Sequence, residues 1–559
     1  MWATVPDLPD IWHRPRGGPP GEGVTRDLPD RVAADMACGD VLTMTPMSAA
    51  EYDYIVVGAG TAGCVLAARL AEDPDVTVLL VEAGPDGRGV AQITDPALWE
   101  TLHHSSLDWC YQYAPSPNVA GRAIPIPRGR VLGGCGAMNA MVWDRGHPAD
   151  YDEWELAGAE GWNHVSLLPY FRRAEDWEGG ATDYRGTGGP LHVGQPKHPH
   201  PLALALLDAA AELGLPRADD AGSGAGREGA ALTSMNIAAR RRHSVADGYL
   251  GRRPGNLTIL TNSTAIRLGF QAQRCVSLLH STHGAPRETH ARREVILALG
   301  TFGTPQLLMS SGIGDPAELS RLGIATPTAL PGVGRNLQDH PLLAGMNFRA
   351  RNRLGLVRDN GSGAVLNWRS SLADRPDLQA SFVQRRHADA AGSARYGLTG
   401  DASVFAISPA LMRPRSTGYL RMHPSGETEI QANLLADPQD VRALTESMDM
   451  IAALASSKAY RDLIEGPVMP TALSHQGKVR FVREHCSTYF HPCGTAAIGS
   501  VVDPELKVVG VNGLRVADAS VIPVIPGCGT QAPVVAIAER AADLIRHART
   551  QTRLSAGNL

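Results

Sequence analysis

A glycine-rich turn between two regular segments constrains this chain more than any other feature. Residues 52–57 (YDYIVV) are an apolar run with β-branched members, which predicts a buried parallel strand. Gly58, Gly60 and Gly63 follow at once, and residues 64–72 have a helical pattern. In such a strand–turn–helix unit the glycines let the main chain approach a pyrophosphate, whose charge the helix N-terminus stabilises. The sequence therefore predicts a dinucleotide-binding unit.

An acidic residue supports this interpretation. Residues 76–81 (VTVLLV) predict a second buried strand, and Glu82 follows directly, 19 residues after Gly63. A carboxylate at this point can accept hydrogen bonds from the ribose of an adenosine group. Thr61 and Ala62, inside the glycine turn, are expected to contact the same cofactor. This unit alone does not distinguish FAD from NAD.

Composition and charge exclude several classes of protein. The 559 residues are 43% apolar, which is enough for a large core spread over more than one domain. The formal net charge is −5, so the chain lacks the excess of basic residues that is typical of nucleic-acid-binding proteins. No apolar stretch approaches the roughly 20 residues of a membrane span. The eight cysteines form no CxxC pair, so neither a disulfide scaffold nor a metal site is expected. We expect a cytoplasmic protein without a secretory signal.

Two further segments stand out by composition. Residues 1–50 contain a stretch rich in Pro, Gly and Arg and have no periodicity, which predicts a disordered N-terminal extension. Residues 127–139 (PRGRVLGGCGAMN) form a second glycine cluster, typical of a loop that lies against something large and flat or charged. Arg128 and Arg130 could pair with phosphate oxygens there or face solvent. Taken alone, the cluster is also compatible with a packed crossover loop.

One histidine near the C-terminus stands among aromatic residues. The segment 489–495 reads YFHPCGT and contains His491. A histidine in such surroundings is more often part of a packed core than a base. With an ordinary pKa near 6.5, it is nevertheless the side chain best suited to accept a proton from an alcohol near neutral pH. The segments 513–520 (GLRVADAS) and 527–533 (GCGTQAP) follow, and residues 532–547 predict a helix.

These motifs together resemble the glucose–methanol–choline (GMC) oxidoreductases, an FAD-dependent family. The similarity extends from about Tyr52 to about His547, nearly the whole chain after residues 1–50. It is carried, in order, by the glycine turn with Glu82, PRGRVLGG with Asn139, PADYDEW (148–154) with GW (161–162), GTFGTPQLL (300–308), SGIG (311–314), GVGRNLQDH (332–340), FHP (490–492), GLRVADAS (513–520) and AERAADLI (538–545). A match of this length and order is highly specific.

The resemblance implies an α/β fold (α+β overall) in two discontinuous domains. A doubly wound, Rossmann-type FAD-binding domain is expected from residues 51–150, 230–345 and 495–550. A substrate-binding domain built on an antiparallel sheet is expected from residues 151–229 and 346–494, and it would cover the isoalloxazine ring. FAD is the expected cofactor and a small alcohol or sugar the expected substrate. No nucleic-acid partner is expected, and a homodimer is left open.

The resemblance also assigns roles to individual residues. His491 would be the active-site base, and Asp518 and Ala519 would hold the ribityl–pyrophosphate part of FAD. His340, in the stretch 332–340, would hold a turn. The full set of expected cofactor-binding residues is Gly58, Gly60, Thr61, Ala62, Gly63, Glu82, Arg128, Leu132, Gly133, Asn139, Ala140, Ala265, Gly300, Asp518, Ala519, Thr530 and Gln531.

The chain departs from the family pattern at two positions. Some members attach FAD through a histidine in the glycine loop, where this chain has Met138, so FAD is expected to be non-covalent. The family pairs its active-site histidine with a second histidine or an asparagine, and Gly529 stands at that position here. Gln531 could supply the missing hydrogen bond, or a water molecule could fill the space. The expected catalytic set is therefore His491 with Gly529 and Gln531.

The activity implied by the resemblance is oxidation of an alcohol. His491 would take the hydroxyl proton as hydride moves to flavin N5, and O₂ or another acceptor would then take the electrons. Phe490 resembles the aromatic neighbour of aryl-alcohol-oxidising members, which favours an aromatic or furanic primary alcohol; a sugar or glycoside hydroxyl stays open. The alternatives are an FAD-containing lyase that cleaves cyanohydrins and an inactive flavin-binding protein.

Overall fold

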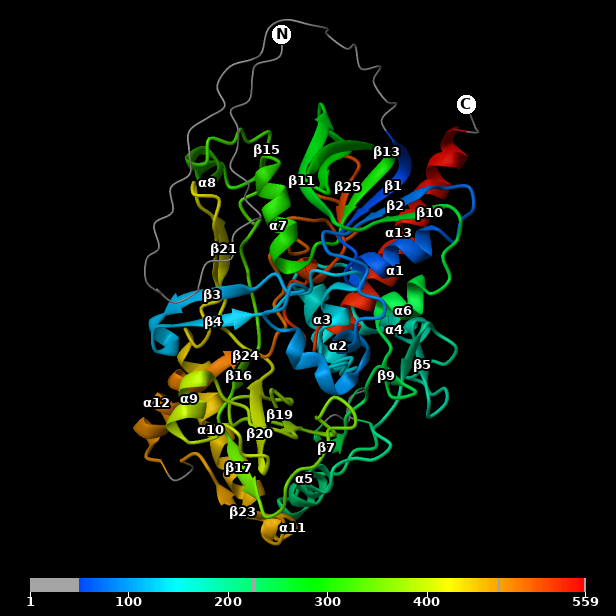
Figure 1. Ribbon diagram of the computed structural model, residues 1–559. Coiled ribbons are helices and arrows are strands. Elements are labelled where there is room, and N and C mark those ends of the chain that lie inside the picture. Colours follow the sequence, from blue (N-terminus) through cyan, green and yellow to red (C-terminus); the bar gives the residue numbers. More distant parts are fainter. Residues whose placement is uncertain (1–49, 221, 223–227, 471–472, 557–559) are drawn as a thin grey trace, which may run out of the picture.

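The computed structural model describes residues 50–220, 222, 228–470 and 473–556 (Figure 1). The expected extension, residues 1–50, lies outside the described residues except for Ala50. Among the described residues, no helix combines the length and apolar character needed to cross a membrane.

The first domain is built on the sheet in the upper part of Figure 1. Its strands are β1 (Glu51–Val57), β2 (Val78–Val81), β10 (Leu257–Leu260), β11 (Ser263–Gln271), β12 (Arg274–Thr282), β13 (Ala285–Leu297) and β25 (Leu514–Val516). The order is β10–β2–β1–β13–β12–β11, and β25 also pairs with β13. Strands β10, β2, β1, β13 and β25 are parallel, whereas β12 and β11 continue the sheet antiparallel. The strands predicted at 52–57 and 76–81 are confirmed as β1 and β2, of which β2 begins two residues later than predicted.

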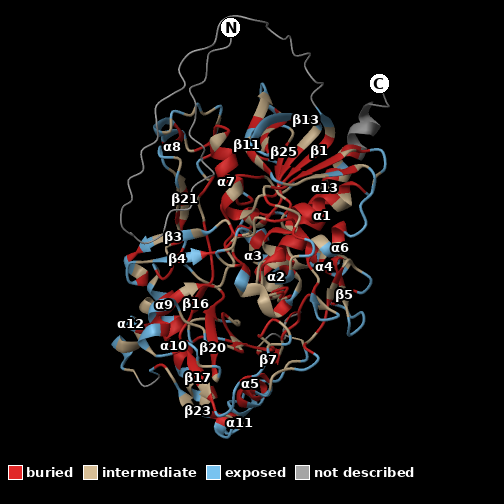
Figure 2. Cartoon of the chain, in the orientation of Figure 1, coloured by how far each residue is buried: buried red, intermediate tan, exposed pale blue. Residues whose placement is uncertain are grey.

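Helices cover this sheet. Helix α1 (Thr61–Leu70) packs on α13 (Gln531–Ala556), and α7 (Gly300–Ser310) packs on β11. Because parallel strands covered by helices have no solvated face, β2 and residues 54–57 of β1 consist of buried apolar residues (Figure 2). The helix predicted over 64–72 is confirmed as α1, which begins three residues earlier and ends two residues earlier, and the helix predicted over 532–547 lies within α13. This is the expected Rossmann-type α/β arrangement.

The second domain, in the lower part of Figure 1, is built on an antiparallel sheet. Its strands are β7 (Gly229–Leu232), β16 (Pro341–Leu343), β17 (Asn347–Ala350), β18 (Ala364–Trp368), β19 (Leu378–Val383), β20 (Val404–Leu411), β23 (Ile464–Pro467) and β24 (Cys486–Thr488). The order is β23–β17–β20–β19–β18–β7, and β16 joins β20 to β24. Strands β7 and β16 belong to this sheet, although residues 230–345 were expected to belong to the FAD-binding domain.

Helices and hairpins complete the two bodies. The antiparallel sheet is covered by α5 (Pro201–Glu212) and α10 (Pro438–Ala455), and α10 packs on α12 (His475–His485). Near the first sheet, α4 (His164–Ala174) packs on α3 (Pro148–Leu156) and α13, and α6 (Val245–Leu250) packs on α1. The hairpin of β3 (Tyr111–Ser116) and β4 (Arg122–Ile126) lies between the two sheets in Figure 1.

Candidate active site

A cavity of about 340 Å³ is lined by residues of both domains. Val57, Val81 and Ala298, at the carboxyl ends of β1, β2 and β13, line its first part. Gln379 and Ser381 of β19, in the antiparallel sheet, line the other part. Because ligands of open α/β sheets bind outside the carboxyl ends of the parallel strands, this cavity is the expected position of a nucleotide cofactor with a substrate beyond it.

The first glycine turn needs glycine for steric reasons. Gly58 has a φ of +98°, and a Cβ atom on it would lie 2.6 Å from the carbonyl oxygen of Ala298. A Cβ atom on Gly63 would lie 1.8 Å from the carbonyl oxygen of Gly58, so α1 can pack this closely on β1 only with glycine there. Gly60 is the N-cap of α1, which aims its first main-chain N–H groups toward the cavity end of β1.

Glu82 anchors this turn to the neighbouring strand. Its carboxylate accepts the main-chain N–H of Ala59 at 3.0 Å and that of Gly84 at 2.9 Å. Burial raises the pKa of Glu82 to about 7, and the two N–H donors favour its ionised form. The carboxylate also lines the cavity, where its remaining lone pairs can accept hydrogen bonds from a ribose.

The second glycine cluster packs against the first. The N–H of Gly133 donates to the carbonyl of Ala59 at 2.8 Å, and a Cβ atom on Gly134 would lie 2.6 Å from the Cα atom of Gly60. The loop therefore does both things left open from the sequence: it is tightly packed, and it lines the cavity with Arg128, Asn139 and other residues.

Most of the expected cofactor-binding residues line the cavity. These are Gly58, Gly60, Thr61, Ala62, Glu82, Arg128, Asn139, Ala140, Ala265, Gly300, Asp518, Ala519, Thr530 and Gln531. Gly63, Leu132 and Gly133 are instead packed behind the lining. Asp518, at the end of β25, accepts the N–H of Gly300 at 2.8 Å and the hydroxyl of Thr304 at 2.6 Å, so it fixes the start of α7 at the cavity.

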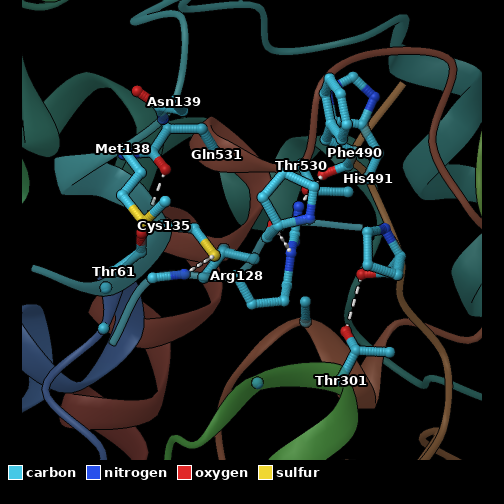
Figure 3. Close-up of a pocket in the computed structure, with 18 of the residues that line it drawn as sticks. Thr61, Arg128, Cys135, Met138, Asn139, Thr301, Phe490, His491, Thr530 and Gln531 are labelled. Atoms are coloured by element: carbon cyan, nitrogen blue, oxygen red, sulfur yellow. Dashed lines mark hydrogen bonds between the residues drawn. The ribbon is translucent and has the colours of Figure 1, made fainter. Parts of the chain in front are cut away.

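His491 lies in the same cavity (Figure 3), and Gly529 lies next to it. A Cβ atom added to Gly529 would lie 3.2 Å from Nε2 of His491. The φ of Gly529 is not positive, so its backbone conformation does not itself require glycine. The glycine therefore leaves open space directly beside Nε2.

The Nδ1 atom of His491 is engaged by another histidine. It lies 2.9 Å from Nδ1 of His340, whose side chain is fully buried. Burial, with the nearby charge of Arg128, holds the pKa of His491 well below its ordinary value. At neutral pH the imidazole is therefore uncharged and able to accept a proton. Sequence reasoning assigned His340 only to a turn, and the only signal for this contact was its place in the 332–340 stretch.

Arg128 and Gln531 make hydrogen bonds that the sequence did not reveal. Nη2 of Arg128 donates to the carbonyl of Phe490 at 2.8 Å, and Thr61 Oγ1 donates to Oε1 of Gln531 at 3.1 Å (Figure 3). The first contact joins the glycine loop to the residue before His491. The second ties the start of α13 to α1 and engages the Gln531 amide oxygen with a residue other than His491.

The second part of the cavity has an aromatic side and a polar side. The ring of His103 contacts Trp99 and Phe490, with centroid distances of 5.4 and 5.6 Å. On the other side, the hydroxyl of Tyr489 lies 2.6 Å from Ser381 Oγ and donates to Gln379 Oε1 at 3.2 Å. Sequence reasoning found Phe490 but none of the residues from β19, because nothing local marks them as part of a site.

One group of side chains outside this site could in principle hold a metal ion. Among the described residues, His104, Asp108 and Cys110 place one ligand atom each within 4.8 Å of one another. The Asp108 carboxylate, however, already accepts main-chain N–H groups of His104, Cys110 and Arg128 at 2.8–3.0 Å. Through these contacts the Asp108 carboxylate fixes the conformation of the loop that leads into β3.

The residues present fit FAD. The glycine turn offers main-chain N–H groups to a pyrophosphate, and Glu82 offers a carboxylate to a ribose. The two glycine loops approach each other more closely than any side chain would allow. From these groups the lined surface continues to His491 and β19. One continuous cavity can therefore hold an extended dinucleotide and a substrate beside it.

Comparison with known proteins agrees with this site. The N-terminal family model of GMC oxidoreductases matches residues 52–342, and the C-terminal model matches residues 414–538. The chain is 35% identical to the mitochondrial choline dehydrogenase of Homo sapiens, covering 89% of this chain and 90% of that protein. The structure is similar to that of pyridoxine 4-oxidase from Mesorbium loti, with a TM-score of 0.85, 32% identity and coverage of 89% and 99%.

A second solved structure, that of a formate oxidase, aligns with a TM-score of 0.83 and 29% identity, covering 90% of this chain and 99% of that one. GMC oxidoreductases bind FAD and act on alcohols, which agrees with the cofactor site and with a neutral imidazole beside it. The chain therefore belongs to the GMC oxidoreductase family and is an FAD-dependent alcohol oxidoreductase.

Proposed function

We propose that this enzyme oxidises a primary alcohol carried on an aromatic or furanic ring, with His491 as the base. The observation that carries the proposal is the position of His491. Its imidazole is uncharged, its Nδ1 atom is engaged by His340, and its Nε2 atom faces the space left by Gly529. This is the arrangement that a proton acceptor for an alcohol requires.

The aromatic side of the cavity favours a planar substrate. Trp99, His103 and Phe490 all line it, and the His103 ring contacts each of the other two edge to face. Such a wall can hold a flat ring by apolar contact and by aromatic pairing, worth about 0.5–1.5 kcal/mol per pair beyond the area buried. The similarity to pyridoxine 4-oxidase supports the same class, because pyridoxine carries primary alcohols on a heteroaromatic ring.

The same wall disfavours a quaternary ammonium substrate such as choline. Glu100 lines the cavity beside Trp99, but Nη1 of Arg385 pairs with its carboxylate at 3.0 Å. The Arg385 guanidinium also lies over the Trp99 ring, 5.7 Å from its centroid. The carboxylate and the ring face that would attract a substrate cation are therefore engaged by a protein cation.

A sugar hydroxyl is the second candidate, and the polar side of the cavity favours it. Gln379, Ser381 and Tyr489 present hydrogen-bonding groups on one wall. A polyol could exchange hydrogen bonds with them, whereas an unsubstituted aryl alcohol could not. A substrate panel containing both classes distinguishes the two candidates. The lyase and binding-protein alternatives gain no support from the site or from the relatives.

The residues of this chain divide the work of the reaction. The glycine turn and Glu82 would hold FAD, which would supply the hydride acceptor for the alcohol carbon. Nε2 of His491 accepts the hydroxyl proton, and Nδ1–H of the same ring can stay bonded to His340 while the charge develops. The aromatic wall orients the ring of the substrate beside His491.

The test uses purified holoenzyme under anaerobic conditions. Benzyl alcohol, pyridoxine, furfuryl alcohol, glucose and choline are mixed with it, and bleaching of the flavin spectrum is followed by rapid mixing. We expect the ring-bearing alcohols to reduce the flavin with the highest kcat/KM and choline with the lowest. Faster reduction by choline would contradict the proposed substrate class. Peroxide and dye reduction, measured in parallel, decide whether O₂ or another acceptor takes the electrons.

Replacement of His491 tests its role as base. His491→Ala should keep FAD bound but slow flavin reduction by about 10²–10⁴-fold, the usual contribution of a positioned base. The rate of flavin reduction and the dissociation constant of the substrate are measured separately in the same rapid-mixing experiment. An unchanged reduction rate with normal substrate affinity would mean that His491 only packs in the core.

A further inference from the structure

Two histidines meet ring nitrogen to ring nitrogen beside the cavity. Nδ1 of His340 lies 2.9 Å from Nδ1 of His491, and the two rings are nearly perpendicular, at 83° with centroids 5.2 Å apart. His340 does not line the cavity, so it does not face the substrate. It lies behind His491 and acts on the reaction only through it.

A contact between two ring nitrogens requires one ring to donate a proton and the other to accept it. Burial lowers the pKa of His340 to about 3, so its ring is neutral. Its Nε2 atom is buried and makes no hydrogen bond of normal geometry among the described residues. If Nε2 of His491 accepts the alcohol proton, as proposed above, the neutral His491 ring carries its own proton on Nδ1. Nδ1 of His340 is then the acceptor, and Nδ1–H of His491 is the donor.

We propose that His340 is a positioning residue that holds His491 in the Nδ1–H tautomer and so leaves the lone pair of Nε2 free for the alcohol proton. This inference rests on the proposed role of His491 as base. It gives that base a hydrogen-bonding partner in a chain whose Gly529 has no side chain to offer. In this chain the partner acts from behind the ring, on Nδ1, and leaves the side of Nε2 open.

The main chain fixes the two rings relative to each other. Asp339 is buried, and one of its carboxylate oxygens accepts the main-chain N–H of both His340 and His491 at 2.9 Å. Its other oxygen accepts the hydroxyls of Tyr113 and Thr488. One buried carboxylate thus sets the spacing of the histidine pair. Nδ1 of His491 consequently has a preorganised partner before any substrate arrives.

The proton balance of the step is simple. The O–H bond of the alcohol breaks, and its proton forms an N–H bond at Nε2 of His491, which becomes an imidazolium. His340 takes no proton and stays neutral. The hydrogen bond from Nδ1–H to His340 is stronger once its donor ring is charged, so it stabilises the transition state more than the ground state.

Three substitutions at His340 test the proposal. His340→Leu removes the acceptor, His340→Asn keeps an amide oxygen close to the place of Nδ1, and His340→Gln places its amide near the position of Nε2 instead. We expect flavin reduction to slow by about 10–100-fold in the leucine variant, as for loss of one hydrogen bond to a charged group. The asparagine variant should recover most of this loss and the glutamine variant little. Equal rates in the leucine and asparagine variants would overturn the proposal.

A second measurement does not depend on turnover. The holoenzyme is labelled with ¹⁵N at the histidine ring nitrogens, and the His491 signals are assigned by their loss in His491→Gln. We expect a protonated Nδ1 and an unprotonated Nε2 in the wild-type enzyme without substrate, and a mixed signal in His340→Leu. A protonated Nε2 in the wild type would overturn the proposal even if the leucine variant fails to fold.

The two hypotheses fail in different ways. If His491 is not the base, His491→Ala leaves flavin reduction unchanged, whatever the tautomer. If His491 is the base but His340 only fills space, His491→Ala is slow while His340→Leu reduces flavin at the wild-type rate. Flavin content and melting temperature, recorded for every variant, separate a loss of positioning from a loss of folding.

Discussion

Phe490 has a left-handed backbone conformation and directly precedes His491. Its φ is +67°, in the left-handed region, which costs a bulky residue about 1–3 kcal/mol. Its N–H donates to Thr488 Oγ1 at 2.8 Å, and its carbonyl accepts from Arg128 at 2.8 Å. These bonds hold a conformation that sets the direction of the next residue, His491. Arg128, expected to contact the cofactor, thus also braces the turn that carries His491, the proposed base.

Gly529 determines how much room lies beside Nε2 of His491, the proposed base. A Cβ atom there would already lie 3.2 Å from Nε2 of His491, so a longer side chain must occupy the space next to the reacting nitrogen. We expect Gly529→Asn to lower kcat/KM about tenfold for a bulky, substituted alcohol. The same variant should spare or raise kcat/KM for the smaller benzyl alcohol, for which an added hydrogen bond can offset the lost space.

The measurement compares kcat/KM for both alcohols in both proteins, with Gly529→Ala as the control that adds bulk without an amide. The two substrates should respond differently. An equal loss of kcat/KM on both alcohols would mean that Gly529 is needed for the local structure rather than for substrate space. An equal gain on both would mean that the wild type lacks a useful hydrogen bond.

The depressed pKa of His491 predicts the pH dependence of the reaction. The neutral imidazole is the form that accepts a proton, and burial with the nearby Arg128 charge disfavours the cation. As pH falls, activity is therefore lost only when pH drops through the lowered pKa. We expect the acidic limb of kcat/KM to be centred well below pH 6.5. His491→Gln should remove this limb, and a wild-type limb centred at or above pH 6.5 would contradict the prediction.

Helix α13 is joined to three other helices by one buried carboxylate. Glu539 is fully buried, and it accepts hydrogen bonds from Arg69 of α1 at 2.8–3.1 Å and from Tyr249 of α6 at 2.5 Å. It also pairs with Arg173 of α4 at 2.6 Å. The single charge thus fixes the packing of the helices behind the cofactor loop.

Loss of this carboxylate should destabilise the fold. Glu539→Gln leaves two arginines without their buried counter-charge, and we expect the free energy of unfolding to fall by about 3 kcal/mol. Calorimetric or denaturant unfolding measures the change. The matched control is Glu72→Gln, because Glu72 also pairs with Arg69 but its side chain is 46% exposed. That control should cost under about 1 kcal/mol, and equal losses in the two variants would argue against a special role for Glu539.

Elements with a local signal could be predicted from the sequence, and contacts between distant elements could not. The turn after β1 was predictable because steric crowding at Gly58 and Gly63 allows only glycine. The pairing of His340 with His491 joins residues 151 positions apart, and no local pattern encodes it. Gln531 was considered as a partner of His491, but its amide oxygen is bonded to Thr61, which lies 470 positions away in sequence.

At the scale of the whole molecule, the mode of cofactor binding can be tested directly. Met138 lines the cavity where some family members carry an attaching histidine, and a thioether cannot form that bond. We expect acid precipitation to release FAD into the supernatant, which absorbs at the flavin wavelengths while the pellet does not.

Flavin that stays with the pellet would contradict this prediction. Cys135 also lines the cavity and accepts the N–H of Gly129 at its Sγ atom, so Cys135→Ser is the control. Release from that variant alone would show attachment through Cys135.

The order of the elements along the chain has a consequence for biosynthesis. The glycine turn after β1 is made early, but β25, Gly529 and α13, which complete the same sheet and the same cavity, follow the entire antiparallel sheet. A nascent chain therefore carries one half of the cofactor site through most of its translation without the other half. Firm retention of the flavin must wait until residues beyond 531 leave the ribosome. A yellow colour in the product thus reports that translation has passed through α13.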